Sequence, residues 1–382
     1  MPLSREMMRY WMRLASEQPS ANRWSGALTV LIPKGKIRSG ILLSSLALAA
    51  SFTCPEVAAQ GSEPRGCAKA PTSALVVDVK KKGARGDGRT EDTAAIQAAI
   101  DEVAGTGGTV LVPSGTYMID AVGKKRLALR SGMTLRLSSD ATLKAIANGA
   151  RKYAVLSISG VSDVTVVGGT LEGEREAHRG KSGEAGMGIR IDRGAKHITI
   201  SGVTAKKMWG DGFYVRGAKE VKFCAITADN NRRQGLSIVD ADGVLVTHSI
   251  FKNTQGTRPS AGIDLEPNDA QTVKNIRIQN SKFIDNAGSG IQIAGKRGRV
   301  SKVEISRNAF RGNRPLLVED APAVLAWRIC DNRQVTPQPE PSRGAYAFAD
   351  TVEVVVHQND CQDGRDLRFE VNRQRKHRKR AE

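Results

Sequence analysis

Aromatic side chains make up only 4% of the 382 residues, and the five cysteines include no pair at CxxC spacing. The cysteine spacing argues against a zinc site of that kind. The scarcity of aromatics, together with 39 glycines, argues against a helix bundle and predicts many short strands joined by tight turns. With 40% hydrophobic and 25% charged residues, the composition is that of a globular chain rather than a disordered or collagen-like one.

The apolar run near the start of the chain is short. It covers residues 41–50, follows three basic residues between positions 34 and 38, and leads into small residues up to Ala59. Such a run is too short to span a bilayer, and the order basic, apolar, small is typical of a secretory signal. We therefore expect export to the periplasm or the medium and cleavage near Ala59. We also expect that residues 1–33 result from a translation start assigned upstream of the true one.

Export would permit disulfides, which form in oxidising compartments. Once the signal is removed four cysteines remain, and Cys330 with Cys361 is the pair that we consider as a staple of the C-terminal end. No membrane span is expected in the mature chain. The predicted divisions are a leader over 1–59, a linker over 60–74, a main domain over 75–370 and a basic tail over 371–382.

The formal charge of the chain is +19. The leader carries +4 and the last twelve residues carry +5, so residues 60–370 keep +10. A basic body attracts anionic partners, acidic sugars as readily as nucleic acid. Because the sequence holds no recognisable nucleic-acid reader, we expect an acidic polysaccharide and no nucleic acid.

A repeat organises the main domain. Five segments share the pattern glycine, apolar, any residue, apolar, and successive glycines are 23 to 28 residues apart. Each segment is followed by a second alternating one. Alternation of period two predicts strands with one buried face, and a repeat of about 25 residues predicts stacked coils. We predict an all-β right-handed parallel β-helix, with a two-sheet sandwich as the structural alternative. The five glycines are Gly188, Gly212, Gly235, Gly262 and Gly290.

Polar residues also repeat. Ser249, Ser281 and Asn308 fall at one shared offset from the second alternating segment of their repeats. Buried positions that recur once per coil stack on one another in a solenoid, because neighbouring coils lie about 4.8 Å apart. The shared offset therefore predicts an internal ladder of polar side chains.

Residues 93–104 are the one segment for which we expect a helix. Ile96, Ile100 and Val103 would lie on one face of that helix, and Asp92 precedes it as an N-cap. An open coil end exposes strand edges, which invite aggregation. We expect this short N-terminal helix to cover the end of the first coil.

Residues 77–100, which include Lys-Gly-Ala-Arg-Gly-Asp-Gly-Arg-Thr-Glu-Asp-Thr, resemble the N-terminal cap of the pectate-lyase superfamily, and residues 108–117 continue the likeness. This superfamily includes polygalacturonases, rhamnogalacturonases, mannuronan C5-epimerases and phage tailspike depolymerases. The resemblance implies a parallel β-helix and a polysaccharide substrate. It does not select a reaction, because hydrolysis, elimination and epimerisation all occur on this scaffold.

The chain departs from two catalytic patterns of that superfamily. Gln234 stands where polygalacturonases carry the histidine of Gly-His-Gly, and Gly210-Asp-Gly212 stands where they carry Gly-Asp-Asp. The epimerase motif Tyr-Gly-Phe-Asp-Pro-His-Glu is resembled by residues 211–217, with Asp211 in place of the tyrosine and Arg216 in place of the histidine. Neither template is met residue by residue.

The alternation predicts two outward columns along one strip of the solenoid. Asp211, Arg233 and Gln234 precede the strands of two of these coils. A sugar chain could lie along the strip, since coils follow one another every 4.8 Å or so. The first column is Arg190, Tyr214, Ser237, Asp264 and Gln292, and the second is Asp192, Arg216, Val239, Glu266 and Ala294.

Our first functional hypothesis is elimination or C5-epimerisation of an acidic polysaccharide. It needs a cation against the sugar carboxylate and a base near the C5 proton. Arg190, Arg216 and Arg233 suit the first role, with Gln234 as a further contact. Tyr214 suits acid or base chemistry, helped by a neighbouring arginine that favours phenolate. Trp209 would stack against a sugar if its ring faces outward.

Two other hypotheses remain open. Asp211, Asp264 and Glu266 could act as a hydrolase set, with the two aspartates about 10 Å apart by coil spacing, at the upper limit for an inverting pair. The protein could instead bind a polysaccharide without catalysis, as an envelope protein. Two carboxylates without further Asp spacing are weak support for Ca²⁺, so no cofactor or metal is expected. His178, in a polar loop, is a candidate acid or base.

Overall fold

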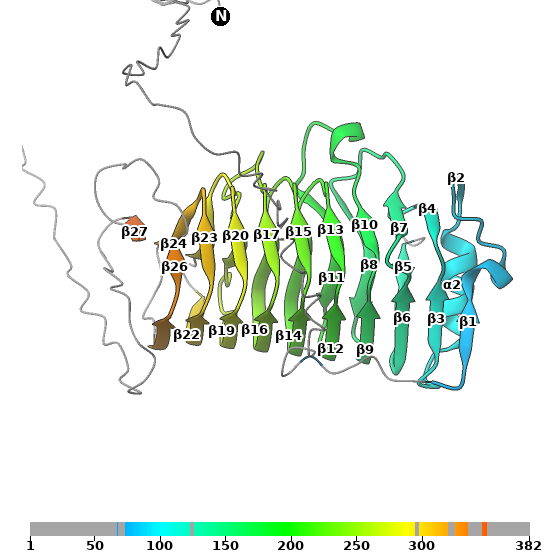
Figure 1. The fold of residues 1–382 in the computed structure, drawn as a ribbon, viewed down its shortest axis with the longest axis horizontal. Coiled ribbons are helices and arrows are strands. Elements are labelled where there is room, and N and C mark those ends of the chain that lie inside the picture. The colour runs from blue at the N-terminus through cyan, green and yellow to red at the C-terminus, as the bar shows by residue number, and fades with distance from the viewer. Residues whose placement is uncertain are drawn as a thin grey trace, which may run out of the picture. The chain divides into compact units, whose positions relative to one another are not determined.

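The computed structural model describes Cys67 and residues 73–122, 126–294, 298–319, 325–334 and 346–349. The predicted signal and basic tail, and most of the linker, lie outside these residues. The described chain winds into stacked coils, each of which adds strands to two parallel sheets (Figure 1). Every described strand pairing is parallel. Parallel pairing throughout is the arrangement of a β-helix, and it rules out the sandwich alternative.

The larger sheet receives up to two strand stretches from each coil. In the middle coils one long strand covers both stretches, as in β14 and β16. The strands of this sheet are β1 (Val76–Asp78), β3 (Thr109–Val112), β5 (Leu127–Ala128), β6 (Met133–Leu137), β8 (Lys152–Ser159), β9 (Ser162–Val167), β11 (Ala185–Asp192), β12 (Lys196–Ser201), β14 (Phe213–Cys224), β16 (Leu236–Thr247), β18 (Ile263–Leu265), β19 (Thr272–Gln279), β21 (Ser289–Ala294), β22 (Arg299–Ser306), β24 (Arg314–Glu319), β25 (Leu325–Cys330) and β27 (Tyr346–Ala349).

The smaller sheet receives one short strand per coil, after which a turn leads back to the larger sheet. These turns and the strands that follow them carry the predicted site residues. The strands are β2 (Asp87–Glu91), β4 (Gly115–Ile119), β7 (Ala141–Ala145), β10 (Thr170–Glu172), β13 (Thr204–Lys206), β15 (Thr227–Asp229), β17 (Ile250–Lys252), β20 (Lys282–Ile284), β23 (Ala309–Arg311) and β26 (Arg333–Gln334).

The core is a continuous apolar column enclosed by the two sheets. Inward residues of successive coils stack directly, as the rings of Phe251, Phe283 and Phe310 do at centroid distances of 5.3 and 4.9 Å. All three rings are buried. A single coil could not bury its own apolar row, so the stacking of neighbours supplies the stability of the solenoid.

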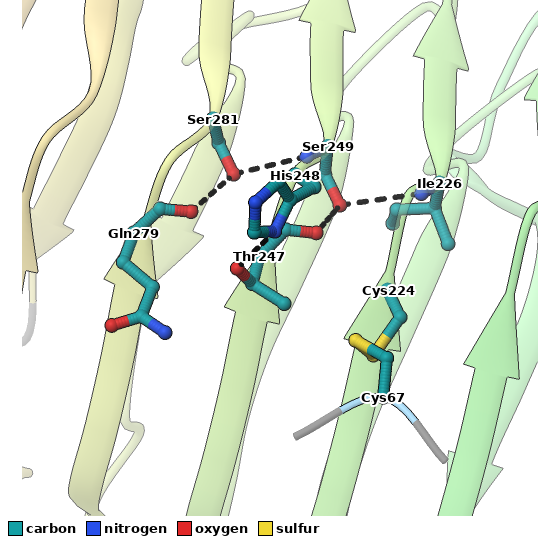
Figure 2. Close-up of a disulfide and its surroundings, with 8 residues drawn as sticks. All are labelled: Cys67, Cys224, Ile226, Thr247, His248, Ser249, Gln279 and Ser281. Atoms are coloured by element: carbon teal, nitrogen blue, oxygen red, sulfur yellow. Dashed lines mark hydrogen bonds between the residues drawn. A yellow bond between two sulfur atoms is a disulfide. The ribbon is translucent and has the colours of Figure 1, made fainter. Parts of the chain in front are cut away.

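The predicted polar ladder is confirmed. The Oγ of Ser281 accepts a hydrogen bond from the backbone N–H of Ser249 at 3.1 Å and donates to the carbonyl of Gln279 at 2.9 Å (Figure 2). Oδ1 of Asn308 accepts in turn from the N–H of Ser281 at 2.9 Å. The ladder extends one coil beyond the prediction, to Asn332. Backbone donors at the corner of the coils are thereby satisfied inside the solenoid.

Helix α2 (Thr93–Glu102) forms where the sequence predicts it and lies beside β1 and β3, at the first-coil end of the described solenoid (Figure 1). Ile96 and Ile100 are fully buried. The predicted capping contact of Asp92 is wrong, because its carboxylate accepts from the backbone N–H groups of Arg85 and Gly86 instead. Two short 3₁₀ helices, η1 (Val79–Lys82) and η2 (Arg175–Ala177), complete the elements.

The disulfide that the structure describes joins Cys67 to Cys224 on β14, 157 residues apart (Figure 2). It ties the segment before the first coil to the middle of the larger sheet. Cys330 is also disulfide-bonded, and Cys361, its predicted partner, lies outside the described residues. Within the described part of the chain, none of the helices is long and apolar enough to cross a membrane.

Candidate active site

The first predicted column forms in register across five coils. Tyr214 on β14 lies between Arg190 on β11 and Ser237 on β16. Asp264 on β18 follows Ser237, and Gln292 on β21 follows Asp264. Because all five residues precede the second stretch of their coils, the column lies on one strip of the larger sheet.

The second predicted column is wrong at one position. The register between β14 and β16 shifts after Val215, so that Arg216 lies opposite Asp240 rather than Val239. Val239 is buried at this irregularity. A β-bulge adds one residue to one strand and moves the following side chains by one place. The first members of the column, Asp192 and Arg216, pair as expected.

Arg233 lies at the centre of the site. Its Nη1 donates to Oδ2 of Asp211 at 3.2 Å, and its Nη2 donates to Oε2 of Glu266 at 3.1 Å. Asp211 belongs to the coil before Arg233 and Glu266 to the coil after it, so the guanidinium bridges three consecutive coils. Burial acts to lower the pKa of Arg233, but Asp211 and Glu266 outweigh it and raise that pKa.

Two neutral side chains from the middle coil complete the cluster. Nε2 of Gln234 donates to Oδ2 of Asp264 at 2.6 Å, and the hydroxyl of Ser237 donates to Oδ2 of Asp211 at 3.0 Å. The middle coil thus separates a carboxyl group on one side from two on the other. We call Asp211, Arg233, Gln234, Ser237, Asp264 and Glu266 the carboxyl cluster.

Both aspartates of the carboxyl cluster are completely buried, at 0% exposure. Burial raises the pKa of Asp211 to about 6, although Arg233 opposes the shift. Burial and the charge of Glu266 raise the pKa of Asp264 well above its usual value. Oδ1 of each aspartate is buried without a hydrogen-bond partner. Asp264 keeps its place in the predicted column, between the core residues Ile263 and Leu265 of the same strand. Neighbouring side chains cover both aspartates, however, so neither is exposed to a bound sugar in this arrangement.

The accessible chemistry of the strip comes from other residues. The side chain of Glu266 is 38% exposed, and Arg216 is exposed and forms no ion pair with a described residue. Tyr214 is partly buried, and burial raises its pKa although Arg216 and Arg190 act in the opposite direction. The predicted phenolate is therefore disfavoured, and the Tyr214 hydroxyl is a proton donor at neutral pH.

Arg190 is held by its own neighbours. Its Nε donates to Oδ2 of Asp192 at 2.6 Å, and its guanidinium carbon lies 5.7 Å from the centroid of the Tyr214 ring. This contact between a cation and an aromatic face fixes the ring on the strip. Arg190 therefore orients Tyr214 and has less freedom than Arg216 to bind a substrate.

Trp209 does not offer a face to a sugar. One face of its ring stacks on His178, with centroids 3.8 Å apart and planes inclined by 12°. The guanidinium carbon of Arg232 lies 3.8 Å from the ring centroid, and Nε1 of the indole donates to the carbonyl of Gly183. The expected stacking role is contradicted because the loop over residues 173–184 and Arg232 already occupy the ring.

His178 lies in that loop, yet its side chain is fully buried rather than exposed. Nδ1 lies 3.0 Å from Oε1 of Glu174, while Nε2 is buried without a hydrogen-bond partner. A substrate on the strip cannot reach the ring in this arrangement, so the structure gives no support to acid or base chemistry by His178.

Sequence reasoning listed Ser237 only as a column member and missed Arg232 and Glu184. Oε1 of Glu184, at the end of the 173–184 loop, lies 3.8 Å from Nε of Arg233. No repeat links that loop to the strip, so no periodic signal could have found the contact. Among the described residues, no group of three or more His, Cys, Asp or Glu side chains could hold a metal ion.

Residues 156–310 match the family model described as a right-handed β-helix region. The chain is a right-handed parallel β-helix protein. This places it in the fold that the resemblance to the pectate-lyase superfamily implied. A curated relative, the mannuronan C5-epimerase AlgE4 of Azotobacter vinelandii, is 34% identical over 151 residues, which are 36% of this chain and 27% of the epimerase.

Two solved structures have a TM-score of 0.51 to this β-helix protein. The family 28 exopolygalacturonase of Yersinia enterocolitica is 15% identical, over 70% of this chain and 66% of the enzyme. The surface protein and adhesin PfbA of Streptococcus pneumoniae is 18% identical, over 72% of this chain and 88% of the adhesin. These two likenesses concern the fold alone. The chain spans less than half the length of the curated relatives that it matches first.

Proposed function

We propose that this β-helix protein acts on an acidic polysaccharide by breaking the C5–H bond of a uronate, followed by elimination or epimerisation. The observation that carries the proposal is the division of the carboxyl groups by depth. Asp211 and Asp264 are fully buried, while Glu266, Tyr214 and Arg216 are accessible on one strip. A sugar on the strip would therefore meet one carboxylate, one neutral phenol and one free guanidinium.

In the proposed reaction the guanidinium of Arg216 binds the uronate carboxylate. Glu266 removes the C5 proton, and the electron pair left behind delocalises into the bound carboxylate, which the cation stabilises. In elimination the C4–O4 bond then breaks, a C4=C5 double bond forms, and the Tyr214 hydroxyl gives its proton to O4. In epimerisation the Tyr214 hydroxyl instead returns a proton to C5 from the opposite face.

The carboxyl cluster would position these groups rather than react. Arg233 donates to Glu266 at 3.1 Å, and its other terminal nitrogen donates to the buried Asp211. Inverting hydrolysis needs two carboxyl groups that both reach the substrate or its water. Only Glu266 of the three predicted acids is accessible, which weighs against the hydrolase hypothesis. The similarity to an epimerase agrees with the proposal, and the similarity to an adhesin keeps binding without catalysis as an outcome of the test.

Export remains part of the proposal. The Cys67–Cys224 disulfide supports it, because structural disulfides persist in oxidising compartments. The surface adhesin among the similar structures agrees with an extracellular or periplasmic place. N-terminal sequencing of the mature protein would test the predicted cleavage near Ala59.

The first test is incubation of the purified protein with alginate and pectate. Elimination gives new ultraviolet absorbance from the unsaturated uronide, and epimerisation changes the uronate ratio without cleavage. New reducing ends without absorbance would replace the proposal with hydrolysis, and binding with no reaction would replace it with the adhesin-like alternative.

The Tyr214→Phe variant sharpens this test. Loss of a positioned proton donor costs about 10²-fold or more in turnover, so we expect at least that loss in kcat with an unchanged fold. Tyr117→Phe is the matched control, because that ring is buried in an early coil and its hydroxyl donates to the carbonyl of Pro113. Equal activity of the two variants would contradict a role for Tyr214.

A further inference from the structure

Two arginines meet at the turns beside the strip, outside the carboxyl cluster. Nη1 of Arg175, in η2, donates to the carbonyl and to Oδ1 of Asn230 at 3.0 and 2.7 Å. Nη1 of Arg232 donates to the carbonyls of Gly183 and Trp209 at 3.2 and 3.3 Å. Both side chains are thus fixed by neutral groups, and both residues are partly buried.

The two guanidinium groups have no direct ion pair among the described residues, although the charge of Glu176 acts on Arg175 at longer range. Glu176 is itself paired with Lys207 at 3.2 Å. Burial, and then the charge of Arg232, lower the pKa of Arg175. Like charges that are partly removed from water repel each other strongly unless an anion joins them.

The two side chains also converge on one point of the backbone. A β-carbon built on Gly256 would lie 3.1 Å from Cγ of Arg232 and 3.2 Å from Nη2 of Arg175. Gly256 has a φ of +123°, which favours glycine. Because this residue has no side chain, both arginine side chains can approach its backbone.

The position of this pair relates it to the carboxyl cluster. Arg232 and Arg233 are consecutive, and both contact the turn of the preceding coil: Arg232 lies over Trp209, and Arg233 donates to Asp211. The stack of His178, Trp209 and Arg232 fixes the plane of the Arg232 guanidinium. The pair therefore lies at the edge of the strip, one residue along the chain from its central cation.

We propose that Arg175 and Arg232 form a subsite for the carboxylate of a sugar next to the reacting unit of an acidic polysaccharide. This inference rests on the proposed function as far as the polymer is concerned. Guanidinium groups suit the role, because each presents several N–H donors in a fixed plane that matches a carboxylate. A carboxylate there would also cancel the repulsion between the two cations.

The test is calorimetric titration of a defined oligouronate into the full-length protein, in a Tyr214→Phe background so that turnover does not change the ligand. Arg175→Gln and Arg232→Gln are each expected to weaken binding about tenfold, the loss typical of one charge-assisted hydrogen bond. Arg175→Lys keeps the charge and should still lose several-fold, because one ammonium cannot replace the planar fork.

Arg179→Gln is the matched control. Arg179 is exposed on the same loop, and its substitution removes one positive charge outside the pair. We therefore expect less than a twofold change in the affinity for the oligouronate at physiological salt. Near-ultraviolet circular dichroism checks that the Trp209 stack survives in Arg232→Gln, and Arg175→Gln leaves that stack untouched. If Arg175→Gln and Arg179→Gln bind alike in folded protein, the subsite is overturned.

Two further measurements separate this inference from the proposed function. A neutral oligosaccharide should show no dependence on Arg175, and a sulfated one that matches the oligouronate in its Arg175 dependence would contradict a carboxylate-specific subsite. With wild-type Tyr214, Arg175→Gln should raise KM for the polymer and leave kcat unchanged. Normal turnover without any effect of Arg175 sinks the subsite alone, whereas absent turnover with Arg175-dependent binding sinks catalysis alone.

Discussion

Two sets of buried polar side chains follow the coil repeat, and their hydrogen bonding differs. In the polar ladder, Ser281 both accepts from Ser249 and donates to Gln279, and the amide of Asn308 donates to the carbonyl of Ile278 at 2.9 Å. In the carboxyl cluster, Asp211 and Asp264 each keep a buried oxygen without a partner. The ladder provides hydrogen-bond acceptors for backbone N–H groups, whereas the carboxyl cluster keeps ionisable groups buried.

This difference separates a structural device from a functional one. A satisfied ladder stabilises its corner and has no reason to be near a ligand. Buried carboxyl groups with raised pKa values lower the stability of the fold when they ionise, and such groups concentrate at functional sites. Within the carboxyl cluster, Arg233 joins the buried carboxyl of Asp211 to the accessible carboxylate of Glu266.

Removal of Arg233 should have the largest effect. Arg233→Gln leaves Asp211 and Glu266 without their cation, and removing one partner of a mostly buried ion pair costs about 3 to 5 kcal/mol of unfolding free energy. Urea denaturation near pH 7 measures it. Arg216→Gln, exposed and unpaired among the described residues, should change stability by about 0.5 kcal/mol or less. If both variants lose equally little free energy of unfolding, Arg233 does not stabilise the carboxyl cluster.

The pH dependence of stability tests the buried carboxyl directly. Because the pKa of Asp211 is about 6 when folded and near 3.8 when unfolded, the folded state holds more protons between these values. Stability should therefore fall as pH rises from 4 to 7, by up to about 3 kcal/mol from this group, and the change should be complete above pH 6.

Asp211→Asn isolates that contribution, since an amide does not titrate. Denaturation curves at pH 4, 5.5 and 7 should show the variant gaining on the wild type as pH rises. Parallel behaviour of the two proteins across that range would mean that the folded and unfolded pKa values of Asp211 do not differ.

A break in the ladder should give the smallest effect and should spare activity. Ser281→Ala removes the acceptor of the Ser249 N–H, and a buried donor left unpaired costs about 1 to 3 kcal/mol. Thermal unfolding and turnover on the same preparation measure both quantities. A loss of turnover at a temperature where the variant stays folded would blur the division between ladder and cluster.

The fold and the ladder follow from the sequence because both are periodic. Alternation of period two places Tyr214 and Asp264 on one face, and the coil repeat puts Ser281 beside Ser249, without any knowledge of loops. The same reasoning fails at Val239, where the β-bulge breaks the period.

The depth of the site could not be predicted, because it depends on segments outside the repeat. The loop over 173–184 has no counterpart in neighbouring coils, and it buries His178 against Trp209. Arg233 and Gln234, from the coil between the two aspartates, contact Asp211 and Asp264 respectively and help to bury them. The partner of Cys224 likewise lies before the first coil, where no periodic signal reaches.

The central claim is that the strip breaks the C5–H bond of a uronate. Proton NMR of a polyuronate incubated with the protein in D₂O measures that event whichever product forms. Elimination removes the H5 signal with the appearance of an unsaturated sugar, and epimerisation replaces H5 with deuterium. We predict loss of H5 with the wild-type protein and retention with Glu266→Gln, which lacks the base. An undiminished H5 signal with wild-type protein that binds the polymer would contradict the account.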